Sequence, residues 1–327
     1  MSEYHIPVLL AESISALITN PDGIYADATF GGGGHTAAIL SRLHDGGRVI
    51  AFDRDSDALA NAPADPRLTL IHNNFRFIEN YAEQLRRTAG EEALSGASAF
   101  HLATERASTP AVFDGILADL GVSSHQFDTE GRGFSFRFEE DRLDMRMNQS
   151  AALTAEEVVN KYTEAELERI LRLWGEVDNA RGVARLVAQA RNLQPLKTTG
   201  DLDRAVEKAL PRGAEHKALA KIYQALRIEV NQEMRSLEKF LEGAARCLKA
   251  DGRLVVITYH SLEDRMVKNF IKTGNVDGIL QQDVFGRVQS PLEAVNRKPI
   301  LPQESEIAGN TRARSAKLRI ARRREEV

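Results

Sequence analysis

A glycine-rich turn between an apolar segment and a helical segment constrains this chain more than any other feature. The apolar residues 24–28 include an acid, Asp27, and glycine occupies all four positions from 31 to 34. Residues 36–40 then begin a pattern typical of a helix. Glycine permits the positive-φ turn and the close ligand approach that a Cβ would block. Strand, turn and helix N-terminus together predict a nucleotide-binding α/β unit.

A second apolar segment supports this interpretation. Residues 48–53 read as a buried strand that ends in Asp53, twenty residues beyond Gly33. An acid at this spacing, at the tip of the second strand, can accept hydrogen bonds from ribose hydroxyls. The sequence therefore predicts that Asp53 binds the sugar of a nucleotide-like ligand.

Two cofactor classes fit such a unit. The dinucleotide fingerprint G-x-G-x-x-G is met at Gly31 and Gly33, but Thr36 occupies its third glycine position. The S-adenosylmethionine pattern D-x-G-x-G-x-G is followed from Asp27 to Gly33, except at Thr29. The acid suits a ligand with an amino group and a sulfonium, and it would repel a pyrophosphate. We therefore favour S-adenosylmethionine over a dinucleotide; a turn without any ligand is the third interpretation.

Composition and charge exclude several other classes. A chain of 327 residues, 43% hydrophobic and 28% charged, is expected to form one large or two ordinary globular domains. The formal net charge of −4 excludes a globally basic nucleic-acid binder, so any such surface must be local. The single Cys247 excludes an intramolecular disulfide. With neither a secretory signal pattern nor an apolar run of spanning length, we expect a cytoplasmic protein with no membrane partner.

The order of the expected elements predicts the fold class. Three further strands are expected, followed by a closing antiparallel pair, at residues 68–72, 112–120, 253–259, 298–301 and 316–321. This is a doubly wound, mostly parallel sheet with an antiparallel last strand, the α/β fold of class I adenosylmethionine-dependent methyltransferases. Such an ending weighs against a dehydrogenase, the class of enzyme that a dinucleotide-binding unit would indicate. Residues 86–110 are expected to form a surface excursion between a helix and the next strand.

A long helical region interrupts the alternation of strands and helices. Residues 154–213 show helical periodicity without any strand pattern, and capping boxes begin at Thr154 and Thr163. We therefore expect a methyltransferase domain in two parts, residues 1–140 and 216–327. The inserted all-helical domain, residues 141–215, would recognise the substrate.

Two segments carry residues suited to RNA. Residues 121–148 interleave arginines with Phe134, Phe136 and Phe138, which suits base stacking. The alternative interpretation is a loop pinned by its phenylalanines. Residues 311–324 hold seven basic residues and no acid, so they could contact phosphates or form a solvated face.

Several short motifs, in order along the chain, are together far more specific than any one of them. They are His5-x-Pro-Val-Leu-Leu10, Asp27-Ala-Thr-Phe-Gly-Gly-Gly-Gly-His35, Asp53-Arg-Asp55, Asp119-Leu-Gly-Val-Ser-Ser124, Arg132-Gly-Phe-Ser-Phe136, Leu143-Asp-Met-Arg-Met147, Tyr259-His-Ser-Leu-Glu-Asp264 and Asn310-x-Arg-x-Arg-Ser-x-Lys-Leu-Arg319. Through them the chain resembles the bacterial 16S ribosomal RNA (cytosine-N4)-methyltransferase H family, also called the MraW family. The chain departs from the family at residues 86–110, which are longer than usual, at His125 in place of a common proline, and at Asp141-Arg142 in place of a common Gly-Pro.

The resemblance implies a function and a set of site residues. The implied reaction transfers a methyl group from S-adenosylmethionine to the exocyclic N4 of a cytosine in 16S rRNA, at the P site of the small ribosomal subunit. The cofactor contacts carry over by motif position onto Gly33, Gly34, His35, Asp53, Phe75, Asp119 and Gln126. Position alone leaves Phe75 equally suited to stacking on adenine and to packing.

The chemistry needs an acceptor near the reacting nitrogen. The lone pair of N4 is delocalised into the ring, so a group that accepts hydrogen bonds from its N–H helps to localise it. Asp119 and the Leu120 carbonyl, at the tip of the fourth strand, are the candidates. His260 is a second catalytic candidate, as proton acceptor or RNA contact; the alternative is a structural histidine. No cluster has metal-ligand spacing, so no metal is expected.

One further interpretation is rejected and another is kept open. His260-Ser261 could suggest a hydrolase, but no nucleophile elbow G-x-S-x-G is present. A non-catalytic adenosylmethionine-binding module for ribosome assembly or regulation is the main competitor. The intact acids Asp27, Asp53 and Asp119 favour the enzyme. The sequence leaves a homodimer open.

Overall fold

The computed structural model describes residues 7–60, 62–95 and 111–325. It separates into two compact units. The first consists of Met1–Gly121 together with Arg235–Val327, and the second of Val122–Met234. They are called here the sheet unit and the helical unit, and each is described by itself.

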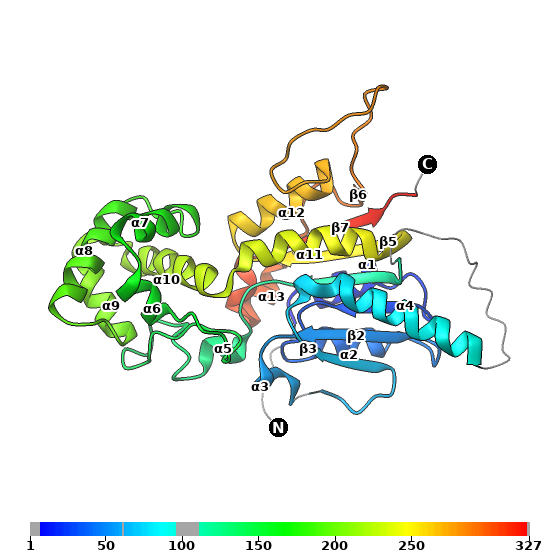
Figure 1. Cartoon of the computed structure of the whole chain (residues 1–327), viewed down its shortest axis with the longest axis horizontal. Helices are drawn as coiled ribbons and strands as arrows, with labels where there is room; N and C mark the ends of the chain where they lie inside the picture. The colour runs from blue at the N-terminus through cyan, green and yellow to red at the C-terminus, as the bar shows by residue number, and fades with distance from the viewer. Residues whose placement is uncertain (1–6, 61, 96–110, 326–327) are drawn as a thin grey trace. The chain divides into compact units, whose positions relative to one another are not determined.

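The sheet unit contains a seven-stranded sheet in the order β3-β2-β1-β4-β5-β7-β6 (Figure 1). Strands β1 to β5 run parallel, and β7 is antiparallel to both β5 and β6. The bounds are β1 Ile24–Asp27, β2 Arg48–Asp53, β3 Leu68–His72, β4 Phe113–Asp119, β5 Leu248–Thr258, β6 Leu292–Ala294 and β7 Lys317–Arg323. This order and these directions confirm the predicted class I methyltransferase fold.

The closing pair differs from the sequence prediction in one strand. The partner of β7 at the sheet edge is β6, not residues 298–301. Ile300 makes only an isolated bridge to Leu318. The sequence misled because Pro299 restricts this segment to an extended shape that resembles a strand, while proline cannot donate a ladder hydrogen bond.

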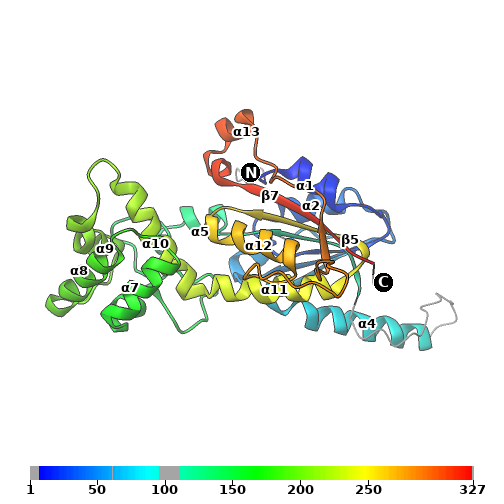
Figure 2. The ribbon, with the colours of Figure 1, turned by 90° about the horizontal axis from the view of Figure 1, so that it is seen from above.

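Helices cover both faces of the sheet (Figure 2). Helices α1 (Leu10–Leu17) and α2 (Gly34–Leu40) lie on one face, and α4 (Ile78–Ser95), α11 (Glu233–Cys247) and α12 (Ser261–Thr273) lie on the other. The α1/α2 side buries one apolar cluster with alternate strand residues, including Tyr25, Val49, Leu117, Val255 and Ile257. This period-two pattern is what a sheet with one face against helices requires. The short elements are α3 (Ser56–Leu59), η1 (Phe75–Phe77), α13 (Glu304–Gly309) and η3 (Thr311–Ser315).

The expected surface excursion at residues 86–110 is described only in part. Its first residues continue α4 as far as Ser95. Residues 96–110 lie outside the described residues.

The helical unit is wider than the expected insert of residues 141–215. Its elements are α5 (Ser124–Asp128), α6 (Ala155–Lys161), α7 (Glu164–Leu173), α8 (Ala180–Leu193), α9 (Thr199–Val206), η2 (Glu207–Ala209) and α10 (Glu215–Asn231). The loop before α6 contributes Phe134, Leu143 and Met145 to the same buried core as Ile222 and Leu226 of α10. Helical periodicity could not place this loop in the unit, because a loop packs without a period. The capping boxes at Thr154 and Thr163 are formed as predicted.

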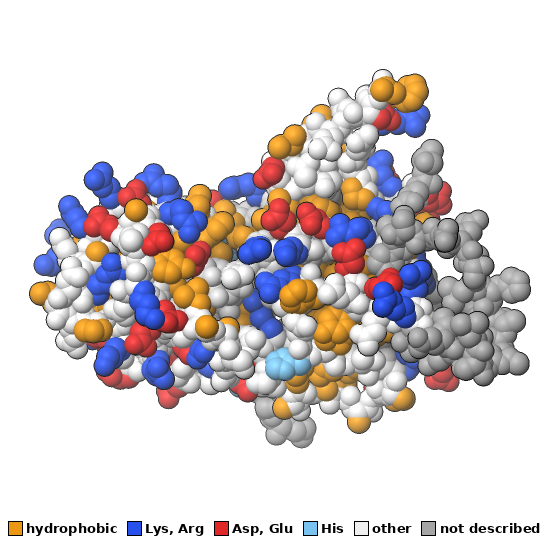
Figure 3. Space-filling view, viewed as in Figure 1, with side chains coloured by type: hydrophobic (Ala, Val, Ile, Leu, Met, Phe, Trp, Pro, Cys, Tyr) orange, Lys and Arg blue, Asp and Glu red, His pale blue; other side chains and the backbone are white. Residues whose placement is uncertain are grey.

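One segment of the sheet unit exposes large apolar side chains. Between α12 and β6, Val284 is 93% and Phe285 81% exposed. Figure 3 shows hydrophobic side chains at the tip of this protruding segment. Among the described residues, no helix is both long and apolar enough to cross a membrane.

Candidate functional site

Three acids lie at the carboxyl ends of three neighbouring strands, and so at the same end of the sheet. Asp27 ends β1, Asp53 ends β2 and Asp119 ends β4. The register pairs Asp27 with Ala51 of β2 and with Leu117 of β4. Strand order reverses between β1 and β4, and ligands of open α/β sheets bind beyond the strand ends at such a switch point. The candidate site is therefore at the carboxyl ends of β1, β2 and β4.

Asp27 holds the glycine-rich turn in place. Its side chain is completely buried. One carboxylate oxygen accepts the Thr29 N–H at 3.1 Å, and the other accepts the Thr36 hydroxyl at 2.6 Å. Burial raises the pKa of Asp27, against the opposing effect of His35 and these hydrogen bonds. Asp27 therefore fastens the turn to the first turn of α2, and does not present its carboxylate at the surface.

The turn requires glycine at two positions. Gly31 and Gly33 have φ of 51° and 77°. A Cβ on Gly33 would lie 2.9 Å from the ring of Phe30, whereas one on Gly31 would meet nothing closer than 3.9 Å. A Cβ on Gly34 would overlap Pro7. The turn is thus closed behind Gly33 and Gly34 and open at Gly31, which leaves room for a ligand against its backbone.

Asp53 joins the second strand to the turn. Its Oδ2 accepts the Gly31 N–H at 2.7 Å, and its Oδ1 accepts the Asp55 N–H at 2.8 Å. Burial raises the pKa of Asp53, although both backbone donors oppose the shift. A carboxylate offers about four acceptor sites, so ribose hydroxyls can use the remaining ones.

Asp119 is held by contacts from three other elements. The Tyr259 hydroxyl donates to Oδ1 at 2.8 Å, and Nδ1 of His35 lies 3.7 Å from Oδ2. The Asp119 N–H donates to Oγ1 of Thr29 at 2.7 Å, which ties β4 to the turn. The Asp119 side chain remains 22% exposed. Burial raises the pKa of Asp119 to about 6. His35 and the Tyr259 hydrogen bond lower this pKa, whereas the charges of Asp27 and Glu263 raise it further.

His35 carries an unsatisfied polar atom. The residue is 5% exposed, and its buried Nε2 has no hydrogen-bond partner among the described residues. Buried polar groups are normally paired, so an orphaned nitrogen beside an open turn is what a site for a polar ligand would show. Together with the open face of Gly31 and the free acceptor capacity of Asp53, it fits S-adenosylmethionine.

Phe75 packs into the sheet unit. It begins η1, next to the tip of β3, and its ring meets Phe240 edge-on at 5.2 Å between centroids. The guanidinium of Arg54 lies 6.0 Å from the same ring. The structure thus shows the packing role directly, and contact with a nucleobase stays a prediction.

The remaining predicted site residues have local structural roles. Gln126 is buried in the helical unit, where it forms a capping box with Ser123 at the start of α5. His260 is the N-cap of α12, in a capping box with Glu263. Its Nε2 lies 3.1 Å from a Glu263 carboxylate oxygen without hydrogen-bonding geometry. The structural alternative for His260 is therefore the one with an observed contact, and its catalytic role stays a prediction.

The aromatic residues proposed for base stacking differ in availability. Phe134 is 5% exposed and belongs to the core of the helical unit, so it cannot stack on a base without leaving that core. Phe136 is half-buried, stacked on His216 at 5.7 Å and edge-on to Tyr223 at 5.6 Å. Phe136 is thus the stronger stacking candidate of the two.

Sequence reasoning missed the two threonines of the turn. In the sequence, Thr29 is a departure from the glycine pattern and gives no sign of a partner. In the structure, its hydroxyl links the turn to the backbone of Asp119. Thr36 was visible only as the wrong residue for a dinucleotide site, yet it holds Asp27. The signal was present in both cases as a hydroxyl close to an acid, but only the three-dimensional turn shows which acid it serves.

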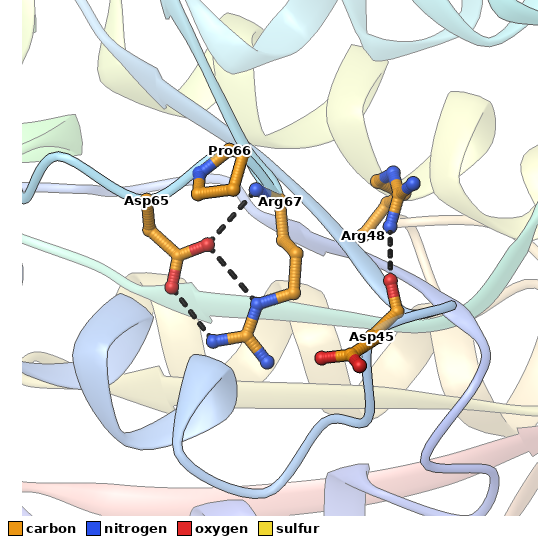
Figure 4. Close-up of a pocket in the computed structure, with 5 residues that line it drawn as sticks. All are labelled: Asp45, Arg48, Asp65, Pro66 and Arg67. Carbon is orange, nitrogen blue, oxygen red and sulfur yellow. Dashed lines mark hydrogen bonds and ion pairs between the residues drawn. The ribbon is translucent and has the colours of Figure 1, made fainter.

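A separate surface cavity lies at the amino ends of β2 and β3, and Figure 4 shows the residues that line it. It measures about 430 Å³ and is lined by Asp45, Arg48, Asp65, Pro66 and Arg67. Arg67 donates twice to Asp65 and once to the Leu43 carbonyl, and Arg48 donates to the carbonyls of Asp45 and Gly47. These arginines are engaged in holding the loops at the amino ends of β2 and β3, so this cavity is structural.

Comparison with known proteins identifies the family. The profile of the MraW methylase family matches residues 2–324. A Bacteroides fragilis protein named ribosomal RNA small subunit methyltransferase H is 51% identical over 321 residues, 98% of each chain. A Flavobacterium johnsoniae protein of the same name is 50% identical over 319 residues, 98% of this chain and 97% of that one.

Solved structures are more distant. A methyltransferase homologue from Pyrococcus horikoshii has a TM-score of 0.39 and 13% identity, covering 96% of this chain and 66% of its own. The N-methyltransferase NodS from Bradyrhizobium japonicum, in complex with S-adenosylhomocysteine, has a TM-score of 0.35 and 11% identity, covering 97% and 84%. It is the sequence match along nearly the whole chain that decides: this chain belongs to the MraW methylase family of S-adenosylmethionine-dependent methyltransferases.

Proposed function

We propose that this chain methylates the exocyclic N4 of a cytosine at the P site of 16S rRNA, in the small ribosomal subunit in the cytoplasm. The observation that carries the proposal is the Asp119 carboxylate, held by Tyr259 at the tip of β4 and still partly exposed. The names of the relatives support small-subunit rRNA as the substrate. The choice of N4 rests on the chemistry of Asp119 and on the motif resemblance.

Six of the proposed cofactor contacts belong to the sheet unit. They are Gly33, Gly34 and His35 at the glycine-rich turn and the start of α2, with Asp53, Phe75 and Asp119 at or just beyond the carboxyl ends of β2, β3 and β4. Gln126 is the one proposed contact in the helical unit. When bound, S-adenosylmethionine supplies a methyl group on a positively charged sulfur. The free acceptor sites of Asp53 suit ribose hydroxyls, and the orphaned Nε2 of His35 suits a polar group of the ligand.

Asp119 meets the chemical need of an amine substrate. It can accept a hydrogen bond from the cytosine N4–H, which localises the lone pair on nitrogen and aligns it for attack. After the new N–C bond forms, the nitrogen must lose a proton, and the carboxylate is the adjacent acceptor. A pKa of about 6 leaves Asp119 mostly ionised at neutral pH while keeping its basicity above that of an ordinary aspartate. The Leu120 carbonyl is the second proposed acceptor.

His260 is retained as a second catalytic candidate with a distinguishing test. If His260 only caps α12, His260→Ala should lower the stability of the protein by about 1 kcal/mol and leave kcat nearly unchanged. A large fall in kcat without a loss of stability would give His260 a direct role.

The helical unit is proposed to bind the RNA around the target base. It exposes five basic side chains on α8, η2 and the region around the start of α10, namely Arg181, Arg185, Lys208, Arg212 and Lys217. Since the whole chain is acidic, phosphate binding requires a local surface of this kind. Figure 3 shows lysines and arginines interspersed with acids on the visible face of this unit, which suits recognition of one RNA shape better than general binding to nucleic acid.

The hypothesis that the protein is an enzyme is tested by measuring methyl transfer from labelled S-adenosylmethionine to small subunits from cells lacking the protein. The enzyme reading predicts label in 16S rRNA with the wild type and about a hundredfold less with Asp119→Asn, since charge-assisted interactions at reacting atoms contribute at this level. Transfer by neither protein, with cofactor binding intact, would favour the non-catalytic module instead.

A further inference from the structure

Tyr259 reaches Asp119 because of the register between two strands. Asp119 at the end of β4 is paired with Ile257 of β5. Tyr259 follows directly after the end of β5 and packs against the same apolar cluster as Ile257, so its side chain lies on that side of the sheet and crosses to the tip of β4. Its hydroxyl donates to Oδ1 of Asp119 at 2.8 Å. Among the described residues, the other oxygen, Oδ2, accepts no hydrogen bond; Nδ1 of His35 lies 3.7 Å from it, beyond hydrogen-bonding distance.

We propose that Tyr259 is a positioning residue for methyl transfer: its hydroxyl occupies Oδ1 of Asp119 and so presents Oδ2 to the substrate amine. The inference rests on the proposed function of Asp119 as the acceptor of that amine. It assigns a role to a residue that is outside the glycine-rich turn and outside the set of proposed cofactor contacts.

The Tyr259 ring is itself fixed. Its backbone N–H donates to a Glu263 carboxylate oxygen at 2.8 Å, and its ring packs against the core on the α1/α2 side of the sheet. Gly121, with φ of 98°, brings its backbone close to the ring, where a Cβ would lie 3.4 Å from Cδ2 of Tyr259. Burial, and then the Asp119 charge, raise the pKa of Tyr259 well above its usual range. The phenol therefore stays protonated and acts toward Asp119 only as a donor.

Four ionisable groups influence Asp119, and Tyr259 is one of the two that stabilise its charged form. His35 from α2 and Tyr259 favour the carboxylate, whereas Asp27 from β1 and Glu263 from α12 oppose it. Removal of the phenol hydroxyl leaves the burial and both acids unchanged. The carboxylate then loses a donor, so its pKa must rise.

The first test is Tyr259→Phe, which keeps the ring and removes the hydroxyl. We expect kcat on small subunits to fall about tenfold or more at neutral pH, with the KM for S-adenosylmethionine within about twofold of wild type. The acidic limb of the kcat profile should move up by about one pH unit. Tyr162→Phe is the matched control, because Tyr162 also donates to a carboxylate, that of Glu229 in the helical unit. The control should leave this limb in place.

A double-mutant cycle shows whether Tyr259 acts through Asp119. If it does, adding Tyr259→Phe to Asp119→Asn should change the residual transfer by less than about twofold. A further tenfold fall in the double variant would mean that Tyr259 works independently of Asp119, which would overturn the proposal.

A measurement without substrate separates this inference from the proposed function. Carbon-13 NMR of aspartate carboxyl groups, with Asp119→Asn to assign the signal, should show Asp119 titrating at higher pH in Tyr259→Phe than in wild type. An unchanged Asp119 titration together with wild-type kcat would overturn the role of Tyr259. If the wild type transfers its methyl group to another atom, the choice of N4 fails, while the shifted titration would still establish the coupling of Tyr259 to Asp119.

Discussion

The Gly31 N–H donates a hydrogen bond to Oδ2 of Asp53 at 2.7 Å, so the acid at the tip of β2 supports the glycine-rich turn. The same carboxylate is the proposed ribose acceptor. Under this proposal Asp53 has two functions, which a single substitution removes together. A loss of cofactor affinity in an Asp53 variant has to be separated from a change in the turn.

Asp53→Ala should weaken S-adenosylmethionine binding about ten- to hundredfold, because hydrogen bonds to a charged acceptor contribute about 1.5–3 kcal/mol. Calorimetric titration measures the affinity. Asp53→Asn is the matched control, since its amide oxygen can still accept one of these hydrogen bonds. Its affinity for S-adenosylmethionine should lie between those of the wild type and of Asp53→Ala. Affinity equal to wild type in the alanine variant would remove Asp53 from the site.

Asp119→Asn should make the protein more stable and much less active. The pKa of Asp119 rises on folding from 3.8 to about 6, so the folded state binds the proton more tightly and stability falls as pH rises through this window. At neutral pH the ionised group therefore lowers stability by about 1–3 kcal/mol, which asparagine avoids. Denaturant unfolding at pH 7 and pH 4 should show the gain at pH 7 and little gain at pH 4. A less stable variant at pH 7 would mean that Asp119 is held by contacts that asparagine cannot keep.

The basic run at residues 311–324 is largely tied into the sheet. Arg319 is buried and donates to Asp264 at 2.7 Å, and Arg322 pairs with Asp251 and Glu293. Burial alone would raise the pKa of Asp264, but Arg319 and Lys317 together lower it. Its stabilising contribution is therefore present above the unfolded pKa of about 3.8 and lost as the pH falls below it.

This arrangement changes the expectation for RNA binding by the run. Arg319→Ala should lower stability by about 1–3 kcal/mol at pH 7, since it leaves the partly buried carboxylate of Asp264 without its main donor. Arg314, which is exposed, should instead act on RNA: Arg314→Ala should reduce the slope of log affinity against log salt by about one unit. An identical slope in Arg314→Ala would assign the run a purely structural role.

Phe136→Ala should weaken RNA use more than cofactor binding, because stacking on one base contributes about 1–3 kcal/mol. Phe134→Ala is the comparison. It should mainly lower the free energy of unfolding of the helical unit, by about 3–5 kcal/mol, since Phe134 is a core residue. Separate measurement of KM for small subunits, cofactor affinity and thermal unfolding distinguishes the two. Equal effects of Phe136→Ala on RNA and cofactor would exclude a stacking role.

The sequence predicted the features that depend on local pattern. Strand tips, the glycine-rich turn and the capping boxes at Thr154 and Thr163 follow from periodicity and residue type over a few positions. The hydrogen bond from Tyr259 to Asp119 could not be predicted in this way, because it depends on the register of two strands far apart in sequence. The burial of Phe134 was hidden for the same reason, since an irregular loop gives no periodic sign of the face that it buries.

The proposed reaction transfers the methyl group to a cytosine amine whose N–H donates a hydrogen bond to Asp119. Nucleoside mass spectrometry identifies the methylated atom in 16S rRNA that the wild-type protein has methylated in vitro, on small subunits from cells that lack it. The digest should contain N4-methylcytidine with the wild type and only a trace with Asp119→Asn. A methyl group on carbon 5, on a ribose oxygen or on protein would rule out this reaction.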